Sequence, residues 1–518
     1  MSEGSFAILH PADAIPRGHI QQVSFEEFRR TIVGAVAGGQ RVAALFGDAP
    51  SPALRSASRL TDDKVDLYAI LSDSARGLLH VGKTTLESDR FPSLTPDCPQ
   101  VHLFEREIAE QYGVCPDGHP WLKPVRFHAP YRPGHDAFSR KPGESPVIGV
   151  TDFYCVEGEE THEVAVGPVH AGIIEPGHFR FQCHGEEVFH LEISLGYQHR
   201  GIERALLGGP TKRTMHMMET VAGDTSVGHA TAYCQALEAL AGCQVPIRAE
   251  VLRGIALELE RLANHTGDLG ALAGDVGFLP TASYCGRIRG DFLNLTALLC
   301  GSRFGRGMIR PGGVGFDLEQ DRKKRCVERL EAAYQDVANA AGLLWASASV
   351  EARFEGTGAV SREDCIALGV VGPAARACGV ECDVRQDFPS GIFRFAQIPV
   401  STWRTGDVFA RAYVRWLEIQ RSVAFIQSQL HELPDGPVRV DVRNARPDHL
   451  VVSLVEGWRG DICHLALTDA QGRFARYKIV DPSFHNWTAL AMALRDQQIS
   501  DFPLCNKSFN LSYCGHDL

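Results

Sequence analysis

The chain carries the stretch Glu219-Thr-Val-Ala-Gly-Asp-Thr-Ser-Val-Gly-His229 and, near its end, Asp481-Pro-Ser-Phe-His-Asn486. Each stretch contains a pair of positions separated by two residues: Ala222 and Thr225 in the first stretch, Ser483 and Asn486 in the second. Alanine offers no donor atom, and neutral hydroxyl or amide oxygens are weak ligands for a soft transition metal, which prefers thiolates. These four positions therefore cannot hold such a metal.

The first stretch leads into a long part of the chain whose apolar residues recur at helical spacing. After Pro246, the residues Leu252, Ile255, Leu259 and Leu262 recur as on one face of an amphipathic helix. Further amphipathic segments are expected at about 229–242, 283–300, 317–346 and 406–431. A mainly α helix bundle with a small β element at its start is the economical architecture for this part.

The preceding residues predict a smaller α+β domain. Ser24-Phe-Glu-Glu27 has the form of a capping box that opens a helix. Segments rich in alternating or β-branched residues predict strands at 41–46, 65–71 and 78–85. From about 128 to 147 the sequence is rich in Pro, Gly and charge, which is typical of a linker. We therefore expect two domains, 1–147 and 148–518.

Composition limits the classes of function. The chain has 518 residues, 44% hydrophobic and 22% charged, as in an ordinary globular protein, and its net charge of −11 argues against nucleic acid as a partner. No apolar run is long enough to span a bilayer, and the N-terminus lacks the order of a signal peptide. The 15 cysteines are scattered singly, which fits reduced thiols and not a cluster site built by this chain.

The end of the first domain resembles a known family. Three of its segments resemble the signature of the small hydrophilic (30-kDa) subunit of respiratory complex I. They are Phe91-Pro-Ser-Leu-Thr-Pro96, Phe104-Glu-Arg-Glu-Ile-Ala-Glu-Gln-Tyr-Gly113 and Gly118-His-Pro-Trp-Leu-Lys123.

The second domain resembles a partner of that subunit. Its motifs, in a consistent order, resemble the large subunit of membrane-bound, energy-converting NiFe hydrogenases, of the hydrogenase-4 and formate hydrogenlyase type, and the homologous 49-kDa subunit of complex I. Besides the two opening stretches, the motifs are Gly167–His170, Glu175–Arg180, Leu195–Glu203, Arg303–Gly313, Gly372–Gly379, Glu456–Gly460 and Asp501–Tyr513.

The resemblance implies a redox function without hydrogen chemistry. In the hydrogenases a C-x-x-C pair stands at each opening stretch and binds nickel and iron, whereas this chain has Ala222, Thr225, Ser483 and Asn486. The family suggests an electron-transfer subunit that receives electrons from a 4Fe–4S cluster on a small partner subunit. It would couple the chemistry of quinone, or of a similar acceptor, to ion translocation, with proton translocation expected. Further implied partners are a ferredoxin-like subunit and antiporter-like membrane subunits. The expected location is peripheral, on the cytoplasmic side of the inner cell membrane.

The same resemblance suggests which residues line the expected cavity. In complex I a histidine on the loop between two strands binds the quinone headgroup, and His178 matches it by its place before Phe179-Arg180. An imidazole there could donate a proton near neutral pH. The complex I tyrosine has no match, and His216 is the side chain that could replace it, while Asp224 could orient a histidine. His229 and Arg200 are expected to face the cavity or the partner's cluster.

Other interpretations remain open. The chain could be a non-catalytic scaffold and coupling subunit with an empty former active site. A metalloenzyme using His216, His229, His485 and Asp481 is a third possibility. Lone histidines, His178 and His229 among them, more often bond backbone groups in a protein core. Glu105, Glu107 and Glu110 predict a solvated helix face or, alternatively, a docking helix. The arginines of 303–310 form either a phosphate-binding loop or a tight turn with paired guanidinium groups.

Overall fold

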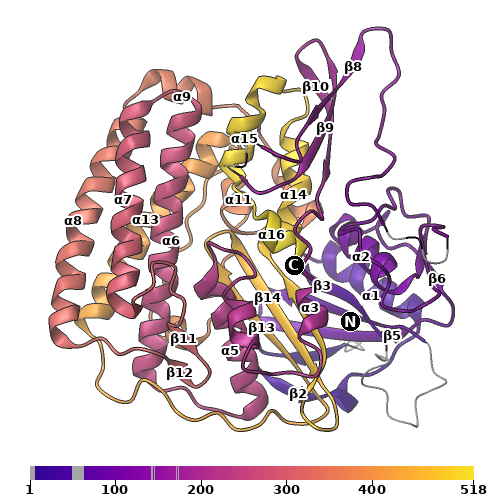
Figure 1. The fold of residues 1–518 in the computed structure, drawn as a ribbon, viewed down its shortest axis with the longest axis horizontal. Coiled ribbons are helices and arrows are strands. Elements are labelled where there is room, and N and C mark those ends of the chain that lie inside the picture. Colours follow the sequence, from indigo (N-terminus) through magenta and orange to yellow (C-terminus); the bar gives the residue numbers. More distant parts are fainter. Residues whose placement is uncertain (1–5, 50–63, 142–143, 145, 171, 173) are drawn as a thin grey trace.

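The computed structural model describes residues 6–49, 64–141, 144, 146–170, 172 and 174–518. In Figure 1 the long helices stand side by side at one side of the molecule, and the N-terminal part lies at the other side. A β-sheet formed by the C-terminal part runs between them. The predicted fold class, an α+β part followed by a mainly α part, is confirmed.

The N-terminal part is an antiparallel sheet packed against helices. Its strand order is β1-β5-β4-β3. The predicted strands and helix are all present. The elements are β1 (Ala7–Leu9), α1 (Phe25–Ala37), β3 (Arg41–Asp48), β4 (Asp66–Asp73), β5 (Leu78–Thr85), β6 (Arg90–Pro92), α2 (His102–Tyr112) and β7 (Cys115–Asp117).

The predicted cap of α1 is confirmed, and its contribution can be measured. The Ser24 hydroxyl accepts a hydrogen bond from the Glu27 N–H at 3.2 Å. We expect Ser24→Ala to lower the free energy of unfolding by about 1 kcal/mol, because that N–H loses its acceptor. Ser347 also stands before a helix, α9 (Ala348–Phe354), but makes no capping bond. Ser347→Ala is therefore the control in a urea titration, and equal losses for both variants would contradict the assignment.

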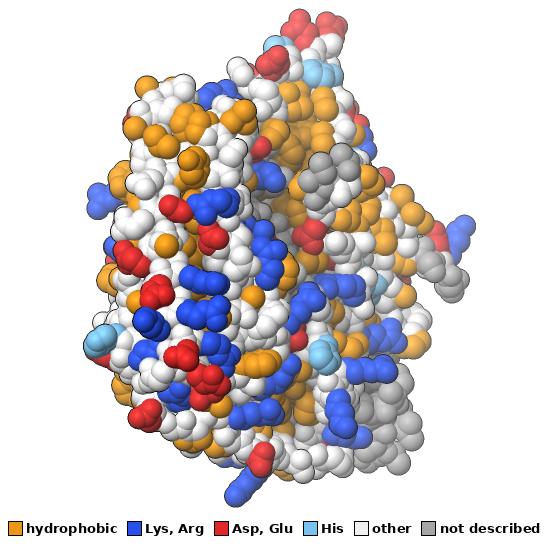
Figure 2. All heavy atoms as spheres, turned by 60° about the vertical axis from the view of Figure 1, so that its left-hand side comes forward, with side chains coloured by type: hydrophobic (Ala, Val, Ile, Leu, Met, Phe, Trp, Pro, Cys, Tyr) orange, Lys and Arg blue, Asp and Glu red, His pale blue; other side chains and the backbone are white. Residues whose placement is uncertain are grey.

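The helical side is built from four long helices, as the apolar spacing predicts. In α6 the predicted face Leu252, Ile255, Leu259 and Leu262 is buried. The long helices are α6 (Ile247–Asp275), α7 (Leu279–Cys300), α8 (Gln320–Trp345) and α13 (Val408–His431). Shorter ones are α3 (Ile202–Ala205), α4 (Thr214–Met218), α5 (Ser226–Ala241), α9, α10 (Arg362–Leu368), α11 (Gly372–Ala377), α12 (Val384–Asp387), α14 (Pro482–Ala493), α15 (Phe502–Phe509) and α16 (Tyr513–Asp517). Figure 2, turned so that this side comes forward, shows charged side chains of both signs across the face.

The small β element expected at the start of the second part is present as an antiparallel three-stranded sheet. Its strands are β8 (Thr161–Val166), β9 (His178–His184) and β10 (Glu187–Ser194), in the order β10-β9-β8. This sheet stands at the top of Figure 1, above the N-terminal part. A two-stranded ladder, β11 (Ile309–Arg310) and β12 (Gly313–Val314), follows later.

A further four-stranded sheet, which was not predicted, joins the two parts of the chain. Its strands are β13 (His449–Gly457), β14 (Gly460–Thr468) and β15 (Phe474–Val480), and β2 (Ala14–Pro16) pairs with β13 at its edge. Apolar residues of these strands, such as Leu450 and Leu465, share one core with the N-terminal sheet. The two parts therefore meet through a common sheet and a common core.

The acidic residues of α2 are not a solvated face. Glu105, Glu107 and Glu110 are all 1% exposed or less. Glu105 accepts hydrogen bonds from Ser93, Leu94 and Thr95, and Glu107 pairs with Lys478 and Arg126. Both the solvated and the docking interpretation of this helix are wrong, because its carboxylates are already bonded inside the molecule.

Candidate functional site

The two opening stretches are in direct contact. The first ends as α5 begins, and the second opens α14, with Asp481 as its N-cap. His229 Nε2 donates to Asp481 Oδ2 at 3.0 Å, and both side chains are buried. The two stretches, which are about 250 residues apart in the sequence, are therefore in contact in the fold.

The four positions that carry thiolates in hydrogenases are filled in and bonded. Asn486 accepts from the Val371 N–H at 2.9 Å and donates to its carbonyl at 3.0 Å. The Ser483 hydroxyl accepts from the Ser512 N–H at 2.9 Å. Thr225 accepts from the indole of Trp458 at 3.2 Å, and Ala222 is fully buried. Neighbouring backbone and side chains therefore pack against the positions that carry thiolates in hydrogenases.

A buried chain of hydrogen bonds continues from the contact between the stretches. His229 Nδ1 lies 3.0 Å from His464 Nε2, and His464 Nδ1 lies 2.9 Å from the Tyr477 hydroxyl. One set of tautomers satisfies every bond in this chain. His229 Nε2 donates to Asp481, His464 Nε2 donates to His229 Nδ1, and the Tyr477 hydroxyl donates to His464 Nδ1, with both imidazoles neutral. Burial lowers the pKa of His464 well below its ordinary value and raises that of Tyr477.

At the end of this chain of hydrogen bonds, the Asp481 carboxylate carries the negative charge. Burial alone would raise the pKa of its carboxyl, but the hydrogen bond from His229 and the positive charge of Arg459 hold that pKa below its usual value. Gly515 lies directly against it, since a Cβ there would come within 2.6 Å of the carboxyl carbon. The C-terminal helix α16 therefore seals this carboxylate from solvent.

A cavity of about 370 Å³ lies beside the contact. Loops before β9 and α5, the turn between β13 and β14, and the segment from α15 to α16 form its walls. Its lining residues are Ile174, Glu175, Gly223, Asp224, Phe304, Arg459, Asn506, Lys507, Asn510, Leu511, Ser512, Tyr513 and Cys514. None of the four former ligand positions is among them, although Ser512 contacts Ser483 and Asp224 precedes Thr225.

The cavity wall offers charged groups, a phenol and a thiol. Arg459 binds Asp224 with two hydrogen bonds, of 2.6 and 2.8 Å. Burial raises the pKa of Tyr513 to about 12 and that of Cys514 to about 11. Both are therefore protonated near neutral pH, so the wall presents hydrogen-bond donors and a neutral thiol. Glu175 accepts from the Tyr513 N–H at 3.1 Å and so joins the strand loop to the C-terminal segment.

The residues singled out from the sequence have different positions. Asp224 lines the cavity, but His178 does not: its ring lies 3.4 Å from the Gly167 carbonyl and accepts from Arg180 at 3.3 Å. Burial lowers the pKa of His178. His216 lies on α4 with its side chain 75% exposed, outside the cavity lining.

The two remaining residues have structural contacts. His229 is fully buried, away from the cavity wall. Arg200 donates to the carbonyls of Thr220, Val221 and Cys514 and thus links the first stretch to the C-terminal segment. Arg310 of the arginine-rich loop pairs with Glu219 at 2.7 Å, which fits the tight-turn interpretation of that loop.

The proposed metal set does not assemble. Within the described ranges no three His, Cys, Asp or Glu side chains stand as a group able to hold a metal ion. His216 is exposed whereas His229, His485 and Asp481 are buried, so these four do not converge. The metalloenzyme interpretation lacks a ligand geometry in the described part of the chain.

Three cavity residues were missed by sequence reasoning. Glu175, Arg459 and Tyr513 all stand in motifs quoted above, but they come together from distant parts of the chain. Glu175 and Tyr513 are separated by 338 positions. The order of motifs shows that a site exists, and only the packing shows which side chains form its wall.

Comparisons with known proteins agree with this architecture. Residues 275–450 match the family described as "Respiratory-chain NADH dehydrogenase, 49 Kd subunit", and residues 53–139 match the "30 Kd subunit" family. The chain is 32% identical to the carbon monoxide-induced hydrogenase of Rhodospirillum rubrum, over 68% of this chain and 97% of the relative. It is 28% identical to hydrogenase-4 component G of Escherichia coli, over 86% and 79%.

A complex I protein and a solved structure match as well. One of the subunits of the NADH-quinone oxidoreductase of Chloroherpeton thalassium is 30% identical, over 66% of this chain and 84% of the relative. A chain of the archaeal membrane-bound sulfane sulfur reductase superposes with a TM-score of 0.64 at 24% identity, covering 70% of this chain and 99% of that chain, which shows a shared fold.

The chain therefore belongs to the family of large subunits shared by complex I and the membrane-bound hydrogenases. Within it, the chain combines a 30-kDa-like part and a 49-kDa-like part. None of its described helices has the length and apolar character needed to cross a bilayer.

Proposed function

We propose that this chain is the acceptor-side subunit of a membrane-associated redox complex that reduces a quinone or a similar carbonyl acceptor and does not activate hydrogen. The observation that carries the proposal is the cavity beside the two stretches: it has hydrogen-bond donors and charge, while the four thiolate positions hold Ala222, Thr225, Ser483 and Asn486. A nickel–iron centre requires those thiolates.

The wall residues suit the reduction of a carbonyl. A quinone takes up two electrons and two protons, and negative charge develops on its oxygens as the electrons arrive. The Arg459 guanidinium, paired with Asp224, lies in the wall, and the neutral Tyr513 hydroxyl can donate a hydrogen bond to such an oxygen. Asn506 lies 3.5 Å from that hydroxyl and orients it. Tyr513 thus takes the role that the sequence assigned to His178 and His216.

The proposal includes partners and a location. The electrons come from a 4Fe–4S cluster on a small partner subunit, which a ferredoxin-like subunit supplies, and antiporter-like membrane subunits use the released energy for proton translocation. The chain then lies peripherally, on the cytoplasmic side of the inner membrane. These assignments rest on the family, whose members include proteins named for NADH-quinone oxidoreductase.

The test uses the purified complex. Added quinol should reduce the partner's cluster, observed by electron paramagnetic resonance, and Tyr513→Phe should slow turnover about 10- to 100-fold because a hydrogen-bond donor to the developing oxyanion is lost. His216→Ala, at an exposed position, is the matched control and should leave turnover unchanged. Hydrogen uptake should be absent. Wild-type turnover in Tyr513→Phe, or hydrogen uptake with stoichiometric nickel, would refute the proposal.

One observation favours a second candidate, a non-catalytic scaffold. The former ligand positions are packed and hydrogen-bonded, as expected where a site has become purely structural. In that case cavity variants such as Tyr513→Phe leave electron transfer intact, whereas changes at Glu107 or Arg200 prevent assembly. The same measurements on the same complex therefore separate the two functions.

A further inference from the structure

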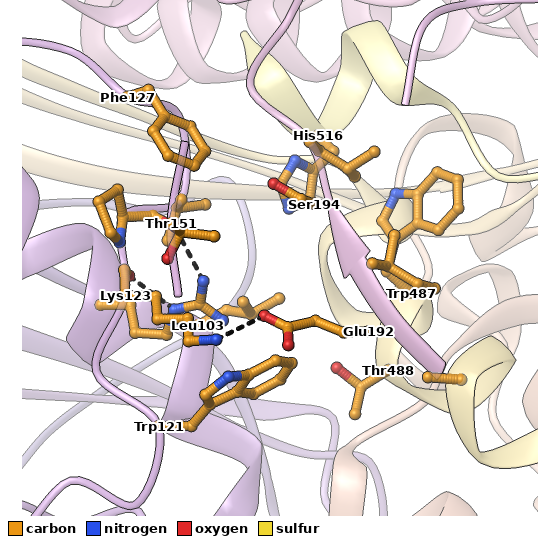
Figure 3. Close-up of a pocket in the computed structure, with 16 residues that line it drawn as sticks. Leu103, Trp121, Lys123, Phe127, Thr151, Glu192, Ser194, Trp487, Thr488 and His516 are labelled. Atoms are coloured by element: carbon orange, nitrogen blue, oxygen red, sulfur yellow. Dashed lines mark hydrogen bonds and ion pairs between the residues drawn. The ribbon is translucent and has the colours of Figure 1, made fainter. Parts of the chain in front are cut away.

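A second cavity lies between the two parts of the chain, apart from the candidate site. Its volume is about 50 Å³, and its walls come from α2, the segment 121–127, β10, α14 and α16. Figure 3 shows Trp121 and Lys123 on one side of it and Trp487, His516 and Ser194 on the other. It shares no lining residue with the larger cavity.

The first notable wall group is a buried cation. Arg106 is 7% exposed and donates from Nε and Nη2 to the carbonyls of Lys123 and Pro124, at 2.8 Å each. Its guanidinium carbon lies 4.9 Å from the centre of the Trp121 ring, which fixes its orientation. Among the described residues no carboxylate forms an ion pair with it, and Nη1 makes no hydrogen bond. Burial accordingly lowers the pKa of Arg106 to about 10.

The second notable group in the cavity wall is the indole N–H of Trp487. Trp487 is 3% exposed, and its Nε1 is buried with no hydrogen-bond partner in the part of the chain that the structure describes. Figure 3 shows the ring at the edge of the cavity, with its nitrogen on the side of Ser194 and His516. A buried N–H without an acceptor is costly, so such a group calls for an acceptor in the adjacent space.

The acidic groups nearby are already engaged. Glu192 also lines the cavity, but one of its oxygens binds Lys123 at 2.7 Å and the other accepts from the Tyr154 N–H at 2.8 Å. Glu110 accepts from the N–H groups of Val125 and Arg126. The Glu192 carboxylate is thus paired with Lys123, and Glu110 is bonded to backbone N–H groups, so neither carboxylate is hydrogen-bonded to Arg106 or Trp487 within the described residues.

The size of the space restricts the ligand. One water needs about 10–15 Å³ of cavity volume, so a cavity of about 50 Å³ holds roughly three to five groups of that size. A planar oxyanion such as formate, acetate or bicarbonate has this number of heavy atoms and can accept from a guanidinium and an indole together. Apolar side chains such as Leu103 and Phe127 complete the wall and suit a short carbon end.

We propose that this cavity is a binding site for a small, planar, monovalent oxyanion, held by Arg106 Nη1 on one side and Trp487 Nε1 on the other. The bound anion lies between the 30-kDa-like part, which supplies Arg106, and α14, which supplies Trp487. The Trp487 ring also packs edge-on against the Tyr513 ring, with the two ring centres 4.8 Å apart. Because Tyr513 lines the cavity of the candidate functional site, the two cavities adjoin each other.

The experiment is a calorimetric titration of the full-length chain with acetate, formate and bicarbonate in separate runs. We expect saturable binding at one site, with the tightest of the three naming the ligand. Trp487→Phe keeps the ring and removes only the N–H, and it should weaken binding about tenfold or more. Arg106→Gln should weaken it further.

Two matched controls complete the design. Trp345 lies elsewhere in the fold and also has a buried indole nitrogen without a hydrogen-bond partner among the described residues, so Trp345→Phe should bind the anion like the wild type. Arg90 is exposed and pairs with Asp117, so Arg90→Gln should also have no effect. The proposal is overturned if none of the three anions binds saturably, if Trp487→Phe binds as tightly as the wild type, or if phosphate, which is larger and tetrahedral, binds as well as acetate. Because Trp487→Phe changes one N–H, the outcome does not depend on whether Arg106→Gln folds.

Discussion

Replacing His229 with alanine should destabilise the protein by about 3–5 kcal/mol, because the buried Asp481 carboxylate loses a hydrogen bond and the missing ring leaves a void in the core. The substitution also removes the hydrogen bond to His464 and opens a void next to α14. Urea unfolding of the full-length chain, followed by circular dichroism, measures the loss. Unlike the removal of an exposed ion pair, this change cannot be compensated by water, since both groups are sealed.

The matched control is His216→Ala. His216 is the other histidine that the sequence singled out near the first stretch, but its side chain is 75% exposed and lies 3.8 Å from Glu219. We expect its removal to change the free energy of unfolding by less than about 0.5 kcal/mol. If His229→Ala were equally mild, the buried chain from Asp481 to Tyr477 would not hold the two stretches together.

This contrast shows what the sequence could and could not predict about the site. The two stretches were expected to meet, because in the hydrogenases they bind nickel and iron together, and they do meet. Which histidine is buried depends on packing: His229 faces β14 and α14, whereas His216 lies on a short helix at the surface. A single histidine in a sequence has no signal that separates these two cases.

The strands β3 to β5 were predicted from their alternating or β-branched residues, although β3 and β4 are buried at nearly every position. The apolar spacing predicted α6, and the capping box placed the start of α1. The sheet β13–β15 was missed. The segment His449–Gly457 is also buried at nearly every position, and the spacing of a short apolar run does not separate a buried strand from a buried helix segment.

The burial of the acidic helix α2 was also not predicted from the sequence. Its charged residues look like a surface in the sequence, because their partners lie far away along the chain. Glu107 is bonded to Lys478, 371 positions later, and Lys478 also binds Glu203 at 3.1 Å. Burial alone would raise the pKa of the Glu107 carboxyl, but Lys478 and Arg126 hold it below its ordinary value. This ion cluster lies where the two parts of the chain join.

Lys478→Met should therefore cost about 3–5 kcal/mol of stability at neutral pH, because it leaves two buried carboxylates, Glu107 and Glu203, short of a cation. Lys324→Met is the control: Lys324 is exposed and 4.0 Å from its partner, and its loss should have almost no effect. Thermal or urea unfolding of the two variants gives the comparison. Equal stability of the two would show that the cluster does not join the parts.

The pH dependence of this loss follows from the lowered pKa of the two carboxyls. A carboxyl whose pKa is lower in the folded than in the unfolded chain stabilises the fold above its unfolded pKa, about 4.3 for glutamate, and the contribution is lost as the pH falls through the folded pKa. Without Lys478 both pKa values rise, so acid neutralises the stranded carboxylates earlier. The stability gap between Lys478→Met and the wild type should thus be widest near pH 7 and narrow steadily below about pH 4.3. A gap that stays constant from pH 7 to pH 3 would mean that the methionine acts through altered packing and not through the unpaired charges.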